Sequence, residues 1–213
     1  MNQIVPTKIV VIHDDLFDEE NNTSPIIVTL KLKYGESNVV LFRHSREGLD
    51  YVLNNLGQKM VVLLDRNFQD SREIDGIEVF EKIREETSLV YVILVTASRI
   101  SEINSDVLKK LINKDLFKLE SFTSDYTKIV NLIDEAIQLL DVRVDAVIED
   151  WIVRHPVEKR NQVILKTKEG ETYTMNDLLE SIRKQTDVGI TFEKNLLKLA
   201  IELFSRQKLK LDD

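Results

Sequence analysis

The sequence predicts an α/β protein in which a doubly wound, five-stranded parallel sheet is followed by a small C-terminal α+β unit. Five short apolar runs alternate with helical patterns as far as about residue 140. Three of these runs are almost continuous in Val, Ile and Leu, which is typical of parallel strands that helices cover on both faces. After His155-Pro156 the alternation gives way to two strands and two helices. The chain is therefore expected to divide into residues 1–140, a connecting stretch 141–155 and residues 156–213.

Each strand of the sheet is predicted from an apolar run bounded by turn or helix signals. The five expected strands are Lys8–Ile12, Asn38–Phe42, Lys59–Leu64, Val90–Val95 and Leu116–Phe122. The helices between them carry apolar residues at spacings of three and four, and are expected at Pro25–Tyr34, Ser45–Leu56, Gly76–Glu86 and Ser101–Lys114. The first helix is the best bounded, because Ser24 supplies an N-cap, Pro25 fits the first helical position and Gly35 follows the end.

A fifth helix is expected to begin near Thr123, and its apolar repeat continues well past the end of the sheet. The apolar residues alternate steps of four and three, at Tyr126, Val130, Ile133, Ile137, Leu140, Val144, Val147 and Trp151. A sustained 3.5-residue period favours a left-handed coiled coil, so one extended helix is expected as far as Trp151. We expect this helix to form a homodimer through Val130, Ile137, Leu140, Val144, Val147 and Trp151. The alternative is that the C-terminal segment of the same chain docks on the stripe.

The last 58 residues, 156–213, predict a compact ββαα unit. Gln162–Thr167 and Glu171–Thr174 flank a short turn and are typical of a β-hairpin. Thr174 is followed three residues later by Asp177, which predicts a capping box at the start of a helix that ends near Gln185. A last helix is expected from about Thr191 to Gln207, with its apolar residues on one face. A unit of this size is marginally stable alone, so it should pack against the long helix or a second copy.

Composition excludes several classes of function. The 213-residue chain has no cysteine, which excludes disulfides, thiolate catalysis and cysteine-ligated metals. No apolar run is long enough to span a membrane and the N-terminus lacks the features of a secretory leader, so a cytoplasmic protein is expected. The net charge is −8, and residues 155–213 are nearly neutral with 11 basic and 10 acidic side chains. Binding to nucleic acid requires clustered positive charge and is therefore not expected.

Polar residues follow three of the predicted strands. His13, Asp14 and Asp15 come after the first strand, Asp65 after the third, and Thr96 after the fourth. In a doubly wound sheet the carboxyl ends of the strands meet at one edge and form the site. Carboxylates that share such an edge favour a hard divalent cation such as Mg²⁺. A carboxylate beside that ion can attack phosphorus, and an adjacent hydroxyl can bind the phosphoryl oxygens.

In this order and spacing, residues 7–140 resemble the receiver domain of bacterial two-component response regulators. The stretches KMVVLLDRNF, DGIEVFEKIRE and VYVILVTAS are close to the central pattern of that family. The resemblance implies a sheet of order 2-1-3-4-5 and a signalling function in which a sensor histidine kinase or phosphotransfer protein donates a phosphoryl group to Asp65. It implies Mg²⁺ ligands at Asp14, Asp65 and the main chain of Asn67, a switch hydroxyl at Thr96, and an aromatic switch residue at Phe117.

The sequence departs from the family pattern at three places. His13 replaces the first acid, for which Asp15 could compensate, and the loop after Asp65 is about three residues longer than usual. Glu120 stands where the family has an invariant lysine, and Lys118 is the candidate to substitute for it.

These departures leave two other functions open. One is a pseudo-receiver that never carries phosphate and acts as a dimeric protein-interaction module. The other, less favoured by the charge, is a transcription regulator that binds DNA through the C-terminal unit. No enzyme activity is expected beyond self-phosphorylation and autodephosphorylation, because the motifs of other catalytic sites are absent from the sequence.

Overall fold

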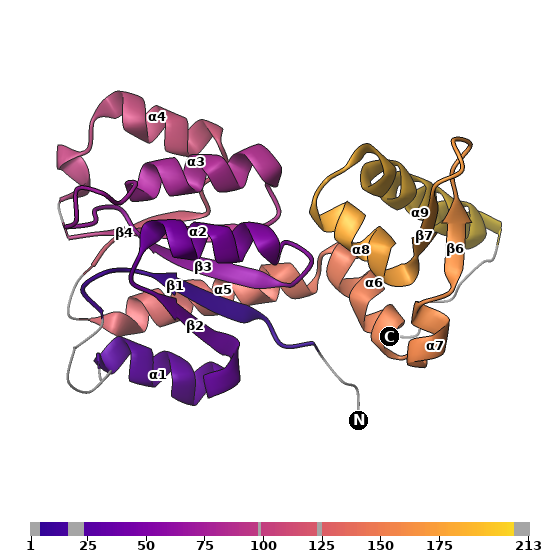
Figure 1. The fold of residues 1–213 in the computed structure, drawn as a ribbon, viewed down its shortest axis with the longest axis horizontal. Coiled ribbons are helices and arrows are strands. Elements are labelled where there is room, and N and C mark those ends of the chain that lie inside the picture. The colour runs from indigo at the N-terminus through magenta and orange to yellow at the C-terminus, as the bar shows by residue number, and fades with distance from the viewer. Residues whose placement is uncertain (1–4, 17–23, 98, 123–124, 207–213) are drawn as a thin grey trace.

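A computed structural model describes residues 5–16, 24–97, 99–122 and 125–206. The N-terminal part contains a five-stranded parallel sheet of order β2-β1-β3-β4-β5, which confirms the predicted fold class (Figure 1). Its strands are β1 (Lys8–Ile12), β2 (Val39–Phe42), β3 (Met60–Asp65), β4 (Tyr91–Thr96) and β5 (Lys118–Ser121). Each strand lies within two or three residues of the range that its apolar run predicts.

Helices cover both faces of this sheet, as the continuous apolar strands require. Helices α1 (Pro25–Tyr34) and α5 (Tyr126–Asp141) pack on one face. Helices α2 (Ser45–Asn54), α3 (Gly76–Glu86) and α4 (Ser105–Asn113) pack on the other. Two short 3₁₀ segments, η1 (Glu36–Asn38) and η2 (Ile100–Glu102), precede β2 and α4.

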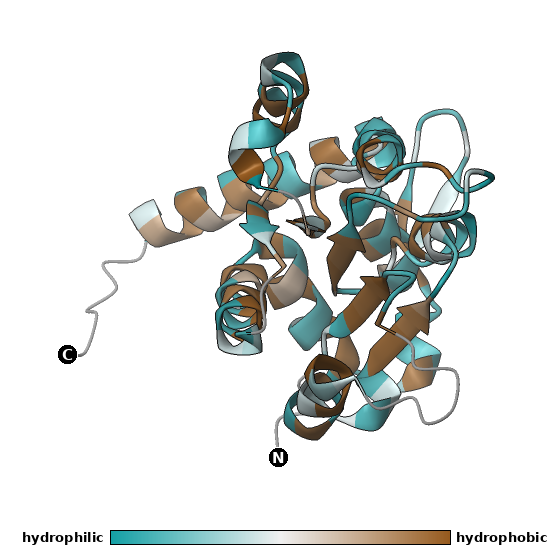
Figure 2. Cartoon of the chain, turned by 90° about the vertical axis from the view of Figure 1, so that its left-hand side faces the viewer, coloured by the Kyte–Doolittle hydropathy of each residue, from teal (hydrophilic) through white to brown (hydrophobic). Residues whose placement is uncertain are grey.

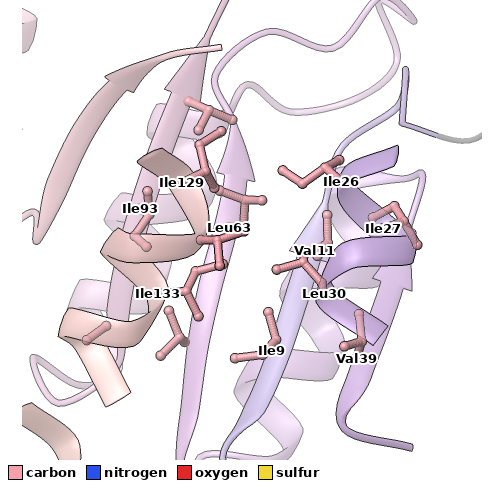
Figure 3. Close-up of a cluster of buried hydrophobic side chains, with 14 of the residues drawn as sticks. Ile9, Val11, Ile26, Ile27, Leu30, Val39, Leu63, Ile93, Ile129 and Ile133 are labelled. Atoms are coloured by element: carbon pink, nitrogen blue, oxygen red, sulfur yellow. The ribbon is translucent and has the colours of Figure 1, made fainter. Parts of the chain in front are cut away.

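The core between α1, α5 and the sheet shows why these residues fold in this way. Ile26 and Leu30 of α1 approach β1, and Ile129 and Ile133 of α5 lie over β3 near Leu63 (Figure 3). All five side chains are almost completely removed from water. Complete burial of an aliphatic side chain contributes about 1.5–3 kcal/mol, so this layer is a major source of the free energy of folding.

The predicted extension of the fifth helix to Trp151 is wrong. Helix α5 ends at Asp141, and a separate helix α6 (Val144–Val153) begins after Arg143, whose backbone is extended. At the break, Nε of Arg143 donates to Oδ1 of Asp145, two residues along the chain, at 2.8 Å, and a second guanidinium nitrogen makes a tertiary contact with the carbonyl of Leu89. A continuous coiled-coil stripe across the two helices is therefore excluded.

The residues of the expected dimer seam consequently have different environments. Val130 and Leu140 are buried in the core of their own domain, and Ile137 packs at its edge. Val147 and Trp151 on α6 are 58% and 49% exposed. Dimerisation through these residues stays a prediction, now without the continuous helix from which it was inferred.

The C-terminal part contains a β-hairpin and helices, as predicted. It comprises α7 (Val157–Arg160), β6 (Val163–Lys166), β7 (Thr172–Thr174), α8 (Met175–Arg183) and α9 (Asp187–Arg206). The capping box is present at the start of α8, where the Thr174 and Asp177 side chains each accept from the backbone of the other residue. Helix α9 begins four residues earlier than expected, because Thr186 and Asp187 start a helix rather than forming an extended turn.

Helix α6 joins the C-terminal part, although a linker was expected at this place. Ile148 and Ile152 of α6 pack against Met175 and Leu179 of α8. Figure 1 shows α6, α8, α9 and the hairpin gathered at one end of the large sheet. The stretch between the two parts therefore contributes to the smaller core.

Figure 2 shows the distribution of hydropathy along the chain. The strands of the large sheet are strongly hydrophobic, whereas α9 has apolar residues along a helix that projects away from the rest of the molecule. Among the described residues, no helix combines the length and the hydropathy needed to cross a membrane.

Candidate functional site

The carboxyl edge of the large sheet brings together polar residues from strands that are distant in sequence. Ile12 of β1 pairs with Leu64 of β3, so His13 follows at the level of Asp65. Asp65 in turn pairs with Val95 of β4, and Thr96 comes next. The predicted convergence of the three strand ends is therefore what the pairing register produces.

Three of these side chains form one cluster, which we call the strand-end cluster: His13, Asp14 and Asp65. Each offers a ligand atom, and these atoms lie within 4.8 Å of one another. Nδ1 of His13 is 3.8 Å from Oδ1 of Asp14 and 3.6 Å from Oδ2 of Asp65. The His13 and Asp65 side chains are only 7% and 9% exposed, so the groups interact with little screening by water.

Backbone N–H groups hold the cluster in place. The N–H of Asn67 donates to Oδ1 of Asp65 at 3.2 Å, and the N–H of Asp15 donates to Nδ1 of His13 at 3.2 Å. Because Nδ1 accepts this bond, the neutral His13 ring carries its proton on Nε2. The orientation of all three side chains therefore depends on the loops that follow β1 and β3.

The environment of the cluster opposes the charged form of Asp65. Burial raises the pKa of the Asp65 carboxyl to about 7, and the charges of Asp14 and Asp15 act in the same direction. Burial also lowers the pKa of His13, although the same two carboxylates oppose that shift. At neutral pH the cluster thus combines a neutral imidazole with a carboxyl group that is partly protonated.

The donor set fits a divalent cation. Oδ1 of Asp14 is buried and has no hydrogen-bond partner, which is costly for a carboxylate oxygen unless another group compensates it. Carboxylate oxygens are the ligands that Mg²⁺ prefers, and Asp14 and Asp65 supply them side by side. The imidazole of His13 is a ligand more typical of transition metals.

The other predicted site residues lie near the cluster without joining it. Asp15 is exposed, and its Oδ1 accepts from Nε2 of Gln69 at 2.6 Å. Asn67 is exposed two residues beyond Asp65 and reaches the cluster through its main chain. Thr96 is completely buried at the end of β4, and its carbonyl accepts from the N–H of Phe122 at 2.7 Å.

The structure does not bring Lys118 to the cluster. Its ammonium group donates to Oε1 of Glu135 on α5 at 2.8 Å, so the expected substitution for the missing lysine is not seen. Glu120 pairs with Lys128 of α5 at 2.7 Å, which neutralises the carboxylate that stands in the lysine position. The ring of Phe117 precedes β5 and packs 4.7 Å from that of Tyr91, at the opposite end of β4 from Thr96.

Sequence reasoning missed Gln69. Its N–H donates to Oδ2 of Asp14 at 2.7 Å, so the loop after β3 contacts both acids that follow β1. The unusual length of this loop was the available signal. An open cavity of about 500 Å³ adjoins the cluster and is lined by Asp14, Asp15, Arg43, His44, Gln69, Asp70 and Glu73.

No protein-family model matches the chain, and no curated protein matches it significantly in sequence. Solved structures do match. The N-terminal domain of an uncharacterized protein from Wolinella succinogenes is 13% identical, with a TM-score of 0.49 over 63% of this chain and 96% of that one. A receiver domain from Clostridium thermocellum is 20% identical, with a TM-score of 0.45 over 62% of this chain and 94% of that one.

A third structure is the response regulator TrrA of Thermotoga maritima in complex with Mg²⁺ and beryllium fluoride. It is 19% identical, with a TM-score of 0.42 over 61% of this chain and 98% of that one. These are distant matches, and the likeness concerns the fold. The sheet order β2-β1-β3-β4-β5, with helices on both faces, is the order that the resemblance to a receiver domain implies.

Proposed function

We propose that this protein is a response-regulator-like signalling protein that binds a divalent cation at Asp14 and Asp65 and accepts a phosphoryl group on Asp65. The observation that carries the proposal is the strand-end cluster. It places a buried carboxylate oxygen without a partner, on Asp14, next to a carboxyl group with a strongly raised pKa, on Asp65. A cation binds such a site readily, because it compensates both groups at once.

The chemistry follows from the groups at the strand ends. An oxygen of ionised Asp65 attacks the phosphorus of a phosphohistidine donor, the bond between phosphorus and the imidazole nitrogen breaks, and Asp65 becomes an acyl phosphate. The N–H of Asn67 holds the Asp65 carboxylate in position. A bound divalent cation supplies positive charge that favours the ionised carboxylate and the incoming phosphoryl oxygens. The donor partner is then a sensor histidine kinase or a phosphotransfer protein.

The ion pairs made by residues of β5 favour a second function. Glu120 is tied to Lys128 and Lys118 to Glu135, so the described residues offer no lysine to the cluster from β5. A receiver-like fold without a lysine at this position suits a module that binds a protein partner whether or not phosphate is present. In this alternative the acidic residues only shape the surface.

Incubation of the full chain with acetyl phosphate and Mg²⁺ tests the proposal. We expect intact-mass spectrometry to detect one added phosphoryl group, which the Asp65→Asn variant lacks. Asp70→Asn is the matched control, because Asp70 lies in the same loop and its carboxylate pairs with Arg72 at the surface. An added group that persists in the Asp65→Asn variant would place the modification elsewhere.

The Glu120→Lys variant separates the two functions. If only the missing lysine limits the reaction, this change speeds phosphorylation of Asp65, and Lys128 becomes free of its pair. If neither the wild-type chain nor the Glu120→Lys variant accepts a phosphoryl group or binds beryllium fluoride, the phosphate-independent module is the correct function.

A further inference from the structure

Helix α9 carries a mostly apolar seam on one of its exposed sides. Ile190, Leu197, Ile201 and Phe204 are 46%, 44%, 67% and 63% exposed. With Lys194 between the first two, they follow one another at steps of four, three, four and three, which places them on one face of the helix. Single exposed apolar residues are normal, but four of them in one helical row indicate an interface.

The structure buries the start of α9 at Gly189, whereas Leu199 and Leu203, on another side of the helix, are 53% and 50% exposed. Gly189 lies so close to α8 that an added Cβ would come within 2.2 Å of the Ser181 carbonyl oxygen. Val188 and Phe192 line a cavity of about 320 Å³ against Leu165 of the hairpin. The seam is therefore one of the exposed sides of α9, and Figure 2 shows the end of α9 projecting beyond the body of the molecule.

We propose that the seam binds α9 of a second copy of this chain in a parallel two-stranded coiled coil. In heptad terms Ile190, Leu197 and Phe204 occupy d positions, and Lys194 and Ile201 occupy a positions. A β-branched residue at a with leucine at d favours two strands. One lysine at an a position fixes register and oligomeric state at some cost in stability.

The charges beside the seam select the parallel orientation. Glu193 occupies a g position and Lys198 the following e position, five residues later. In a parallel pair, g of one helix faces the following e of the other, so Glu193 meets the second copy's Lys198 on both sides. Within the part of the chain that the structure describes, the side chains of Glu193, Lys194 and Lys198 form no ion pair. They are therefore available to a second copy.

The proposal is independent of phosphorylation, because α9 and the strand-end cluster share no residue. The test measures self-association of the full chain by sedimentation equilibrium, with Asp65→Asn as a variant that should associate like the wild type. We expect the Leu197→Asp plus Ile201→Asp variant to remain monomeric. Val147→Asp tests the competing seam that the sequence predicts on α6, and under the present proposal it should leave the dissociation constant of the dimer unchanged.

Reversing the charges beside the seam tests the proposal more sharply than removing its apolar residues. Glu193→Lys and Lys198→Glu should each weaken self-association by about tenfold, because two attractive pairs become repulsive. An equimolar mixture of these two variants should associate again as a heterodimer, since every facing pair is then opposite in charge. Retention of full self-association by either single variant would overturn the predicted charge pairing.

An introduced disulfide can show whether the two α9 helices are parallel, since the chain has no cysteine of its own. In a parallel pair, Phe204→Cys places two thiols across the seam and should yield a covalent dimer on mild oxidation. Glu202→Cys, on the outer side of the helix, should not. A monomeric wild-type chain at high concentration, or a covalent dimer from Glu202→Cys alone, rejects the proposal.

Discussion

Asp65 occupies a position in which the fold opposes its charge. Burial and the neighbouring acids raise its pKa to about 7, whereas an aspartate in an unfolded chain titrates near 4. Between these values the folded protein retains a proton that the unfolded chain has released. The free energy of unfolding should therefore fall as the pH rises from about 4 to about 7, by on the order of 3 kcal/mol from this group.

The Asp65→Asn variant should lose this pH dependence. We expect it to resemble the wild type near pH 4 and to be more stable by about 3 kcal/mol at pH 8, without added cation. Urea unfolding at a series of pH values measures the difference. Both proteins retain His13, so its own titration contributes to both profiles. If the free energies of unfolding of the two proteins change with pH in the same way, the fold does not disfavour the ionised form of Asp65.

His13 determines how well the same cluster holds Mg²⁺. Its imidazole lies where a third carboxylate, beside Asp14 and Asp65, would add negative charge and an oxygen ligand, both of which strengthen the binding of a hard cation. We expect His13→Asp to tighten Mg²⁺ binding by roughly an order of magnitude, as measured by isothermal titration calorimetry. The control is His155→Asp, which changes the net charge equally but lies on the C-terminal part, where Nδ1 contacts the carbonyl of Trp151.

At the scale of whole elements, the strands and most helices could be predicted because local signals and the fold agree. Met60–Asp65 is buried at every position, and its sequence is correspondingly apolar up to Asp65 at its end. The end of α5 could not be predicted, because Asp141, Val142 and Arg143 are compatible with a helix. The break depends on contacts of Arg143 with Asp145 and with Leu89, which is distant in sequence.

The candidate site, like the elements, could be predicted only in part from the sequence. Strand ends place Asp14, Asp65 and Thr96 at one edge of a sheet, and this much follows from sequence and topology. The partner of an exposed long side chain does not follow, which is why the pairing of Lys118 with Glu135 was missed. The contact of Gln69 with Asp14 similarly depends on the path of a loop.

The packing of α8 against α9 depends on Gly189. On helix propensity alone, Gly189→Ala should stabilise α9 by up to about 1 kcal/mol. An added Cβ would, however, come within 2.2 Å of the Ser181 carbonyl oxygen, and backbone cannot move away cheaply. We expect a net loss of about 2 kcal/mol or more in the free energy of unfolding, measured with urea.

Gly57→Ala is the matched control for this prediction. An added Cβ there would meet Cγ of Glu180 at 3.6 Å, an ordinary van der Waals distance. This variant should change stability by less than about 1 kcal/mol. Stabilisation by Gly189→Ala would show that the two helices are less closely packed than described.

At the scale of the whole molecule, a buried polar network joins the two parts. Arg183 of α8 donates to Oδ2 of Asp145 at 2.9 Å and to both carboxylate oxygens of Glu149 at 3.0 and 2.9 Å. It also donates to the carbonyl of Gly57, just before β3, at 2.6 Å. The C-terminal part thus docks at the amino ends of the central strands, at the opposite edge from the strand-end cluster.

The side chain of Arg183 should therefore be critical for stability. It is 3% exposed, and Arg183→Ala would remove the guanidinium that both buried carboxylates share, leaving Asp145 with Arg143 and Glu149 with Lys59 at 4.0 Å. Loss of one partner of a buried ion pair costs about 3–5 kcal/mol, whereas an exposed pair contributes less than about 1 kcal/mol. Lys184→Ala, which removes only the surface pair with Glu180, is the matched control.

A further variant distinguishes the ion network from simple packing. Arg183→Met combined with Asp145→Asn and Glu149→Gln removes all three charges and keeps similar volumes. Because an uncompensated buried charge is the main cost, this triple variant should recover part of the stability that Arg183→Met loses alone, although Arg143 then loses the carboxylate of Asp145. Urea unfolding measures both effects. If Arg183→Met alone matches the wild type, the two parts are held together by other contacts, such as those of Gln185 with Ser88.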